Sequence, residues 1–238
     1  MKVNFVLLIL ILLPASLSAQ MFSVGGDSGP GEQASANFLR VGYAPIEFSY
    51  TGNIGSVNPQ NRLDFESPAF HIGLETPTLS ASLSFVNKLT GAKDERYLNL
   101  SLDYINRFAF IHSPSFQVGL PLGLMTSLVS VRNEQLNNDF SQTVFGFGIG
   151  AFSAIRIPDK LIVSIEGIPS YGFSNSRGGL FGGSNKGLTA SARLDFLNIF
   201  PGRNLSLGYD YKFSSYDLDD DSFDYDLTYH LITLGVSL

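Results

Sequence analysis

The stretch from Gly187 to Phe213 constrains the fold more than any other part of the chain. Apolar side chains take every second position from Leu188 to Phe196 and again from Leu205 to Phe213, with small polar or charged residues between them. A period of two gives a strand two different faces, and a turn-rich connector lies between the two runs. The stretch therefore predicts an antiparallel hairpin with one apolar and one polar face.

The same alternation recurs along the chain and predicts an all-β protein. Counting each alternating run as one strand gives about ten strands, although eight or twelve also fit. Connections after odd strands are mostly long and polar, whereas those at Pro77 and Pro158 are tight. This asymmetry is typical of a closed, up-and-down transmembrane β-barrel. In the first run, Phe38–Tyr50, the apolar residues change parity near Pro45, which predicts a bulge or a strand edge.

The amino terminus has the pattern of a secretory signal peptide. A positively charged start precedes an unbroken apolar run over Phe5–Leu13 and a small-residue stretch, so cleavage after Ala19 is predicted. The apolar run is too short for a membrane-spanning helix. These features divide the chain into a signal peptide at 1–19, a flexible segment at 20–36 and a barrel at 37–238. The chain has no cysteine, which excludes a lipid-anchored cysteine and disulfide bonds.

Charge is scarce and unevenly placed. Charged residues make up 15% of the chain, below the ~25% of an average soluble domain. The formal net charge of −6 originates in one stretch, Ser214–Asp226, which holds six aspartates and neither lysine nor arginine. The remaining chain is balanced, so the sequence has no basic footprint for nucleic acid.

Alternation alone does not say which face points inward. The polar face carries mostly Ser, Gly, Thr and Asn, whereas a soluble exterior is rich in Lys and Glu. Small residues and paired charges suit the lumen of a narrow barrel, so we expect the apolar face to meet lipid. The alternative is a secreted or periplasmic barrel that binds a small hydrophobic ligand. On the membrane hypothesis the predicted polar network of the lumen comprises Glu75, Asp103, Glu166, Arg193, Asp195, Asp210 and Lys212.

The closing segment, Ile232–Leu238, has an apolar residue at every second place up to the carboxyl terminus. Together with the signal peptide and the hairpin repeat, it resembles the small bacterial outer-membrane β-barrel proteins. The resemblance covers the whole mature chain and lies in the pattern. In that family the last strand ends in an aromatic assembly signal, where this chain has Leu238. The resemblance implies a monomer in the outer membrane of a Gram-negative cell envelope, with membrane lipid, lipopolysaccharide and the assembly machinery as partners.

One acidic run resembles a cation site. Asp217, Asp219 and Asp221 have the alternate spacing of a calcium loop, but Ser222 and Thr228 stand where such a loop needs glycine and glutamate. We interpret the run as a solvated outer loop and keep divalent-cation binding as the alternative. No cofactor is predicted.

The sequence does not predict a catalytic site. Outer-membrane hydrolases need a serine or an aspartate beside a histidine, and no compact motif joins His71, His112 or His230 to a nucleophile. About eight strands just fill their interior, while about sixteen leave an aqueous channel. We therefore predict an outer-membrane barrel with a polar, largely filled lumen and a structural, surface-interaction or narrow-pore role. A soluble ligand-binding barrel ranks second and an outer-membrane hydrolase third.

Overall fold

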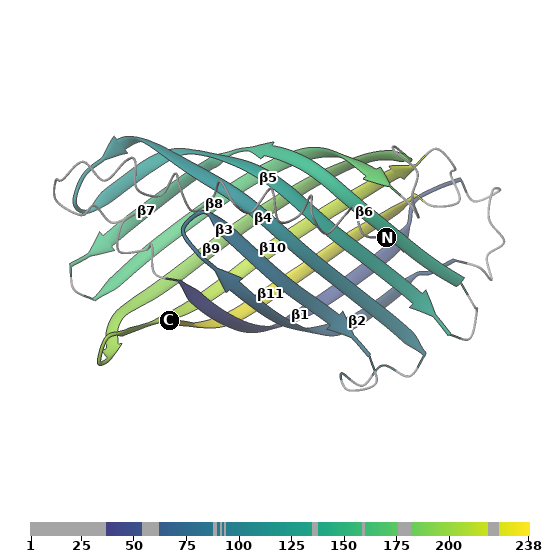
Figure 1. Ribbon diagram of the computed structural model, residues 1–238, viewed down its shortest axis with the longest axis horizontal. Coiled ribbons are helices and arrows are strands. Elements are labelled where there is room, and N and C mark those ends of the chain that lie inside the picture. The colour runs from purple at the N-terminus through teal and green to yellow at the C-terminus, as the bar shows by residue number, and fades with distance from the viewer. Residues whose placement is uncertain are drawn as a thin grey trace, which may run out of the picture.

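The protein forms a closed antiparallel barrel (Figure 1). The computed structural model describes residues 37–53, 62–87, 90, 92, 94–134, 138–158, 160–175, 182–218 and 224–238. The strands are β1 (Phe38–Tyr50), β2 (Phe65–Glu75), β3 (Leu79–Val86), β4 (Glu95–His112), β5 (Phe116–Asn133), β6 (Asn138–Ile149), β7 (Ala151–Ile157), β8 (Leu161–Asn175), β9 (Gly183–Phe200), β10 (Arg203–Leu218) and β11 (Tyr225–Ser237). Neighbouring strands pair in antiparallel orientation, and the pairing of β1 with β11 closes the sheet.

β6 and β7 form one crossing of the barrel wall. Their register against β5 is the same on both sides of Gly150, and so is their register against β8. The Gly150 N–H donates to the carbonyl of Pro121 at 3.1 Å. Proline has no N–H to return, so one bond of the ladder is missing at this point. Ten crossings therefore close the barrel, which confirms the all-β fold and the predicted strand number.

The register fixes the tilt of the strands. A path drawn at right angles to the strands through paired residues leaves β1 at Phe38 and returns to β1 at Tyr50. On the way it passes Glu75, Ser80, Asp103, Met125, Gly146, Gly172, Asn185, Tyr216 and Tyr225. A stagger of twelve residues over ten crossings corresponds to a strand tilt of about 40°, so each residue rises roughly 2.5 Å along the barrel axis.

The two ends of the barrel differ in their connections. At one end, called the turn end, two or three residues join β2 to β3, β4 to β5, β7 to β8 and β9 to β10. Gly202 in the β9–β10 turn has a φ of 71°, a left-handed conformation that favours glycine. At the other end, called the loop end, the connections are longer, from 134–137 up to 51–64. The predicted alternation of short and long connections is confirmed.

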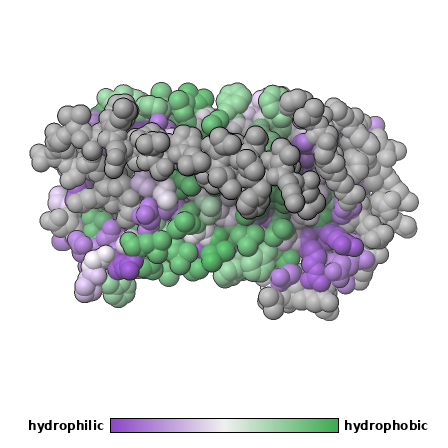
Figure 2. Space-filling view, in the orientation of Figure 1, coloured by the Kyte–Doolittle hydropathy of each residue, from purple (hydrophilic) through white to green (hydrophobic). Residues whose placement is uncertain are grey.

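In the part of the barrel nearer the turn end, apolar side chains point outward. On β10, Leu207 is 44% exposed and Tyr209 is 43% exposed, whereas Ser206 and Asp210, which flank these two residues, are buried. Figure 2 shows the hydrophobic side chains gathered in a band between more hydrophilic ends. We call this band the belt. Its outward apolar face and inward polar face are those that the sequence pattern predicts for a membrane barrel.

Nearer the loop end, the same strands exchange the chemistry of their two faces. On β1 the apolar side chains from Leu39 to Tyr43 point outward, whereas Ile46 and Phe48 point inward and are 1% exposed. Glu47, which lies between those two residues, is exposed. The barrel interior is therefore polar inside the belt and apolar beyond it.

The exchange does not involve a change of strand register. The β1–β2 ladder runs without interruption through Pro45, whose partner is Pro68. The bulge or strand edge predicted at Pro45 is therefore wrong, because β1 also pairs with β11 on its other side. The strand keeps its phase, and the apolar residues move from the odd to the even positions.

Candidate functional site

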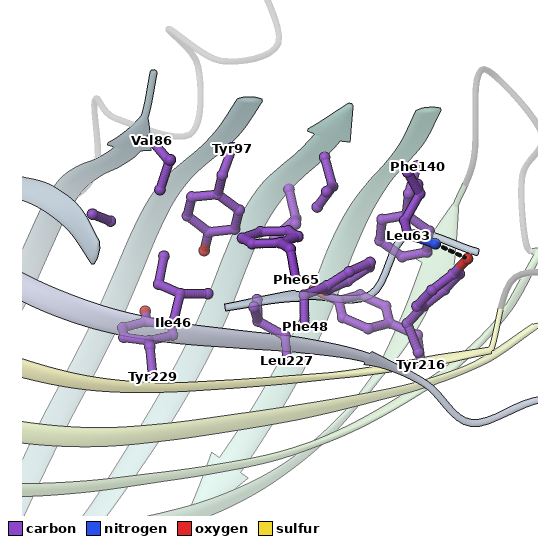
Figure 3. Close-up of a cluster of buried hydrophobic side chains, with 14 of the residues drawn as sticks. Ile46, Phe48, Leu63, Phe65, Val86, Tyr97, Phe140, Tyr216, Leu227 and Tyr229 are labelled. Atoms are coloured by element: carbon purple, nitrogen blue, oxygen red, sulfur yellow. Dashed lines mark hydrogen bonds between the residues drawn. The ribbon is translucent and has the colours of Figure 1, made fainter. Parts of the chain in front are cut away.

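A plug of buried apolar side chains closes the loop end of the lumen (Figure 3). Its members come from β1 to β6, from β10 and β11, and from the segment before β2. They are Ala44, Ile46, Phe48, Leu63, Phe65, Ala69, Val86, Tyr97, Val129, Val131, Phe140, Val144, Tyr216, Leu218, Tyr225, Leu227, Tyr229 and Leu231. The sequence prediction of a polar lumen therefore fails at this end, because the barrel wall here has a polar outer face and needs an apolar core like that of a soluble protein.

Aromatic rings pack closely at the centre of the plug. The ring of Phe48 stacks on Tyr225 at 4.5 Å between centroids and contacts Phe140 at 5.2 Å. Phe140 in turn meets Tyr216 edge-on at 5.3 Å. The hydroxyl of Tyr225 accepts a hydrogen bond of 3.4 Å from the backbone N–H of Leu63, which draws the segment before β2 into the lumen (Figure 3). Such ring pairs add specific geometry to the burial of apolar area.

Ion pairs fill the middle of the lumen below the plug. Arg40 pairs with the carboxylate of Glu75 and donates to the hydroxyl of Ser206 at 2.9 Å. Arg193 pairs with Asp210 at 2.8 Å, and its Nε atom lies 4.0 Å from Glu75. Charges inside a barrel wall persist only when they are paired and hydrogen-bonded. The cluster therefore acts as a cross-link between β1, β2, β9 and β10.

A second cluster connects this middle level with the plug. The ammonium group of Lys212 lies 4.0 Å from the carboxylate of Asp103 and 5.7 Å from the ring centroid of Tyr229. Tyr229 belongs to the plug, so Lys212 lies where polar and apolar lumen meet. The cavities beside these groups measure about 80 and 70 Å³, which is space for a few water molecules each.

One salt bridge spans the lumen near the turn end. Arg107 on β4 donates two hydrogen bonds to Glu166 on β8, at 2.7 and 2.9 Å, and a third to the carbonyl of Pro77 at 2.9 Å. Two parallel bonds from one guanidinium hold a carboxylate in a fixed orientation. A cavity of about 350 Å³ lies at this end, with Phe38 and Asp195 in its lining. The empty space inside the lumen is therefore larger at the turn end than beside the plug.

The three histidines have separate hydrogen-bond partners. His71 and Ser84 are register partners on β2 and β3, and the His71 Nδ1 atom lies 2.8 Å from the Ser84 hydroxyl. Both side chains are buried, so this serine–histidine pair is hidden from solvent. His112 contacts the amide of Gln117 at 2.8 Å on the β4–β5 hairpin. The first pair was not found in the sequence because its residues lie in different strands, although the tight β2–β3 turn fixes their register.

The candidate cation site is only partly described. Asp219, Asp221 and the neighbouring Ser222 lie outside the described residues, and Asp217 is exposed at the loop end of β10. The described ranges contain no cluster of three or more histidine, cysteine, aspartate or glutamate side chains that could hold a metal ion.

No helix among the described residues has the length and apolar character needed to cross a membrane.

The predicted lumen residues all lie on inward-facing positions. Glu75, Arg193 and Asp210 meet in one cluster, Asp103 and Lys212 form the second, and Glu166 belongs to the salt bridge near the turn end. Asp195 is buried and stays apart from these pairs, with one carboxylate oxygen that has no hydrogen-bond partner among the described atoms. The structure thus divides one predicted network into three groups of paired charges, with Asp195 apart from them.

The predicted lumen network does not include two arginines that complete these pairs. Arg40 occupies an inward position between two outward apolar residues, so the alternation on β1 could have assigned it to the lumen. Arg107 falls in a stretch where apolar residues occupy both parities, so the alternation does not assign it to either face. The cause is a register shift between Ala109 and Ile111, which breaks the alternation locally.

No family model matches the chain, and no curated protein matches it. Similar solved structures are bacterial outer-membrane barrels. The outer-membrane protease OmpT of Escherichia coli is 11% identical, with 85% of this chain and 96% of that chain covered and a TM-score of 0.44. Neisserial surface protein A is 11% identical, with 84% and 94% covered and a TM-score of 0.34. The attachment invasion locus protein Ail of Yersinia pestis is 16% identical, with 86% and 99% covered and a TM-score of 0.24.

Proposed function

We propose that this protein is an outer-membrane barrel that is sealed at its loop end and serves as a membrane-anchored structural or surface-interaction protein, without pore activity. The plug carries this proposal. Its aromatic and aliphatic side chains are almost completely buried across the lumen, from Ile46 and Phe48 on β1 to Leu227 on β11. An ion would have to leave its hydration shell to pass between them, which is prohibitively costly.

The belt supports the location in a membrane. On β10 the outward apolar residues run from Leu205 to Phe213, a length of nine residues, and about 9–11 tilted residues suffice to cross a bilayer. Soluble monomers rarely expose contiguous apolar patches larger than about 300–600 Å². A belt that surrounds the barrel is therefore better matched to lipid than to water. The plug, in turn, fills the apolar interior that a soluble ligand-binding barrel would leave open for its ligand.

The orientation and the partners form part of the same proposal. In bacterial outer-membrane barrels the short turns face the periplasm and the long loops face outward, so the plug would lie at the cell surface. Outer-membrane lipid and lipopolysaccharide would surround the belt, and the assembly machinery would receive the last strand. A closed ladder has no unpaired strand edge, which supports a monomer.

Conductance measurement tests the sealed state. Purified protein is reconstituted in planar bilayers, with insertion checked by heat-modifiable migration on gels and with a general porin as the positive control. We expect no single-channel currents from this protein at voltages where the porin conducts. Discrete current steps from correctly folded protein would overturn the proposal, and recovery of the native protein in the soluble periplasmic fraction would favour the ligand-binding alternative.

A further inference from the structure

The belt has different heights on opposite sides of the barrel. On one side, called the tall wall, outward apolar residues extend over thirteen positions of a strand. They run with few interruptions from Phe116 to Leu128 on β5, from Phe145 to Ile157 along β6 and β7, and from Leu161 to Phe173 on β8. Thirteen residues cover about 30 Å along the axis at the tilt of these strands.

On the other side, called the short wall, the outward apolar run is much shorter. It covers Leu39–Pro45 on β1, Pro68–Leu74 on β2, and Ile232 to the residue directly after β11, Leu238. These seven residues correspond to roughly 15 Å along the axis. An outer-membrane barrel normally has an apolar band about 25 Å tall. The short wall therefore falls below that height, while the tall wall exceeds it.

The short wall ends early at the turn end of the barrel. At the turn end, Leu79 at the start of β3 pairs with Tyr104, whereas β4 continues to His112 and its hairpin extends below the β2–β3 turn. Figure 1 shows the β2–β3 turn set back from the β4–β5 and β7–β8 turns. A tilt of the whole barrel would move both edges of the short wall in the same direction and the tall wall in the opposite direction, without changing the height of either. Tilting therefore cannot make the two walls equal.

On β11 the outer face becomes polar directly beyond Ile232. His230 is exposed, and its Nδ1 atom lies 2.7 Å from the hydroxyl of Tyr209. Glu47 and Glu66 follow on the outer face of β1 and β2 beyond Pro45 and Pro68, and both are exposed. These groups mark where the apolar run of the short wall ends toward the loop end.

We propose that the short wall thins the bilayer beside it, so that lipid headgroups of both leaflets lie closer together there than beside the tall wall. This inference rests on the proposed membrane location. We assign lipid, and not a partner protein, to the outer surface of the short wall. The side chains of Val41, Ile72 and Leu234 are apolar and exposed there, and the closed ladder has no free edge that a partner strand could pair with. A bilayer responds to a short hydrophobic surface by local thinning.

The chain contains no tryptophan, so the fluorescence of a single introduced tryptophan reports the depth of that one position in the bilayer. Two pairs of outward residues lie at equal levels along the axis, when levels are counted from the register path: Ile232 with Leu124, and Leu74 with Leu122. Each is replaced singly by tryptophan, and the variants are folded into phosphatidylcholine vesicles that contain lipids brominated near the headgroup or near the chain end. Heat-modifiable migration verifies folding, and Leu234→Trp replaces a short-wall variant that fails to fold.

The expected result is a shallow tryptophan in both short-wall variants and a deep one in both tall-wall variants. Ile232→Trp and Leu74→Trp should be quenched most by bromine near the headgroups, and Leu124→Trp and Leu122→Trp by bromine near the chain ends. Equal depths within each pair would overturn the inference, and so would shallow tryptophans in the tall-wall variants as well, because a tilted barrel moves the short-wall positions toward one leaflet and the tall-wall positions toward the other. Short-wall tryptophans that no brominated lipid quenches would mean that protein covers this wall. If no variant is quenched, the membrane location itself is wrong.

Discussion

The belt and the plug are built from the same strands with opposite arrangements of side chains. In the belt of β10, Leu207 points outward and Ser206 points inward, whereas Tyr216, on the same strand, points into the plug. The register of β10 against β9 and β11 is continuous between these residues. The difference teaches that the environment of the outer face decides which parity of a strand is apolar. Where lipid surrounds the wall the interior can be polar, and where water surrounds it the interior needs an apolar core.

The largest expected effect comes from truncation inside the plug. Phe48→Ala removes a fully buried ring and leaves a cavity, so we expect a loss of about 3–5 kcal/mol in the free energy of unfolding. The matched control is Phe147→Ala in the belt, where Phe147 is 59% exposed. Lipid refills the space there, so only the transfer free energy of about 1.5–3 kcal/mol is lost. Urea titration in lipid vesicles measures both values, and equal losses would argue against a packed plug.

A smaller effect is expected from a charge on the outer face of β10. Leu207→Arg places a guanidinium against lipid, and we expect a loss of about 2–4 kcal/mol if this position lies near the middle of the bilayer. The control variant, Asp217→Arg, places the same guanidinium on the same face of the same strand, but beyond the belt. Exposed surface substitutions usually change stability by less than about 0.5 kcal/mol. Vesicle folding yields and urea titration compare the two variants, and a costlier Asp217→Arg would mean that the belt is misplaced.

Much of the barrel follows from local alternation. The hairpin of β9 and β10 and the closing strand β11 were predicted because a period of two needs only neighbouring residues. The parity exchange on β1 is visible in the sequence too, but the proline at its centre, Pro45, favours a bulge or a strand edge as the interpretation. Val129 and Val131 at the end of β5 repeat the exchange. Because the parity exchange occurs on more than one strand, it predicts an apolar core at that end of the barrel, which is the plug.

The ion pairs of the lumen could be predicted only as a group. Alternation assigns Asp210 and Glu166 to the inner face, but their partners are set by the closure of the barrel. Glu166 on β8 meets Arg107 on β4, a residue 59 positions away in the sequence, because the strands curve around a common axis. No spacing in the sequence encodes that contact. The pairing of the lumen charges can therefore be derived only from the register of the whole barrel.

Accessibility along β1 tests the exchange of faces most directly, because this strand passes from the belt to the plug in thirteen residues. The chain has no cysteine, so single cysteines from Leu39 to Ser49 can each carry a nitroxide label in vesicles. We predict that labels at odd positions collide with oxygen up to Tyr43 and with a water-soluble nickel complex from Pro45 onward, while those at Ala44, Ile46 and Phe48 stay inaccessible to both. Accessible even positions beyond Pro45 would contradict the account, since they would show that the strand itself changes phase.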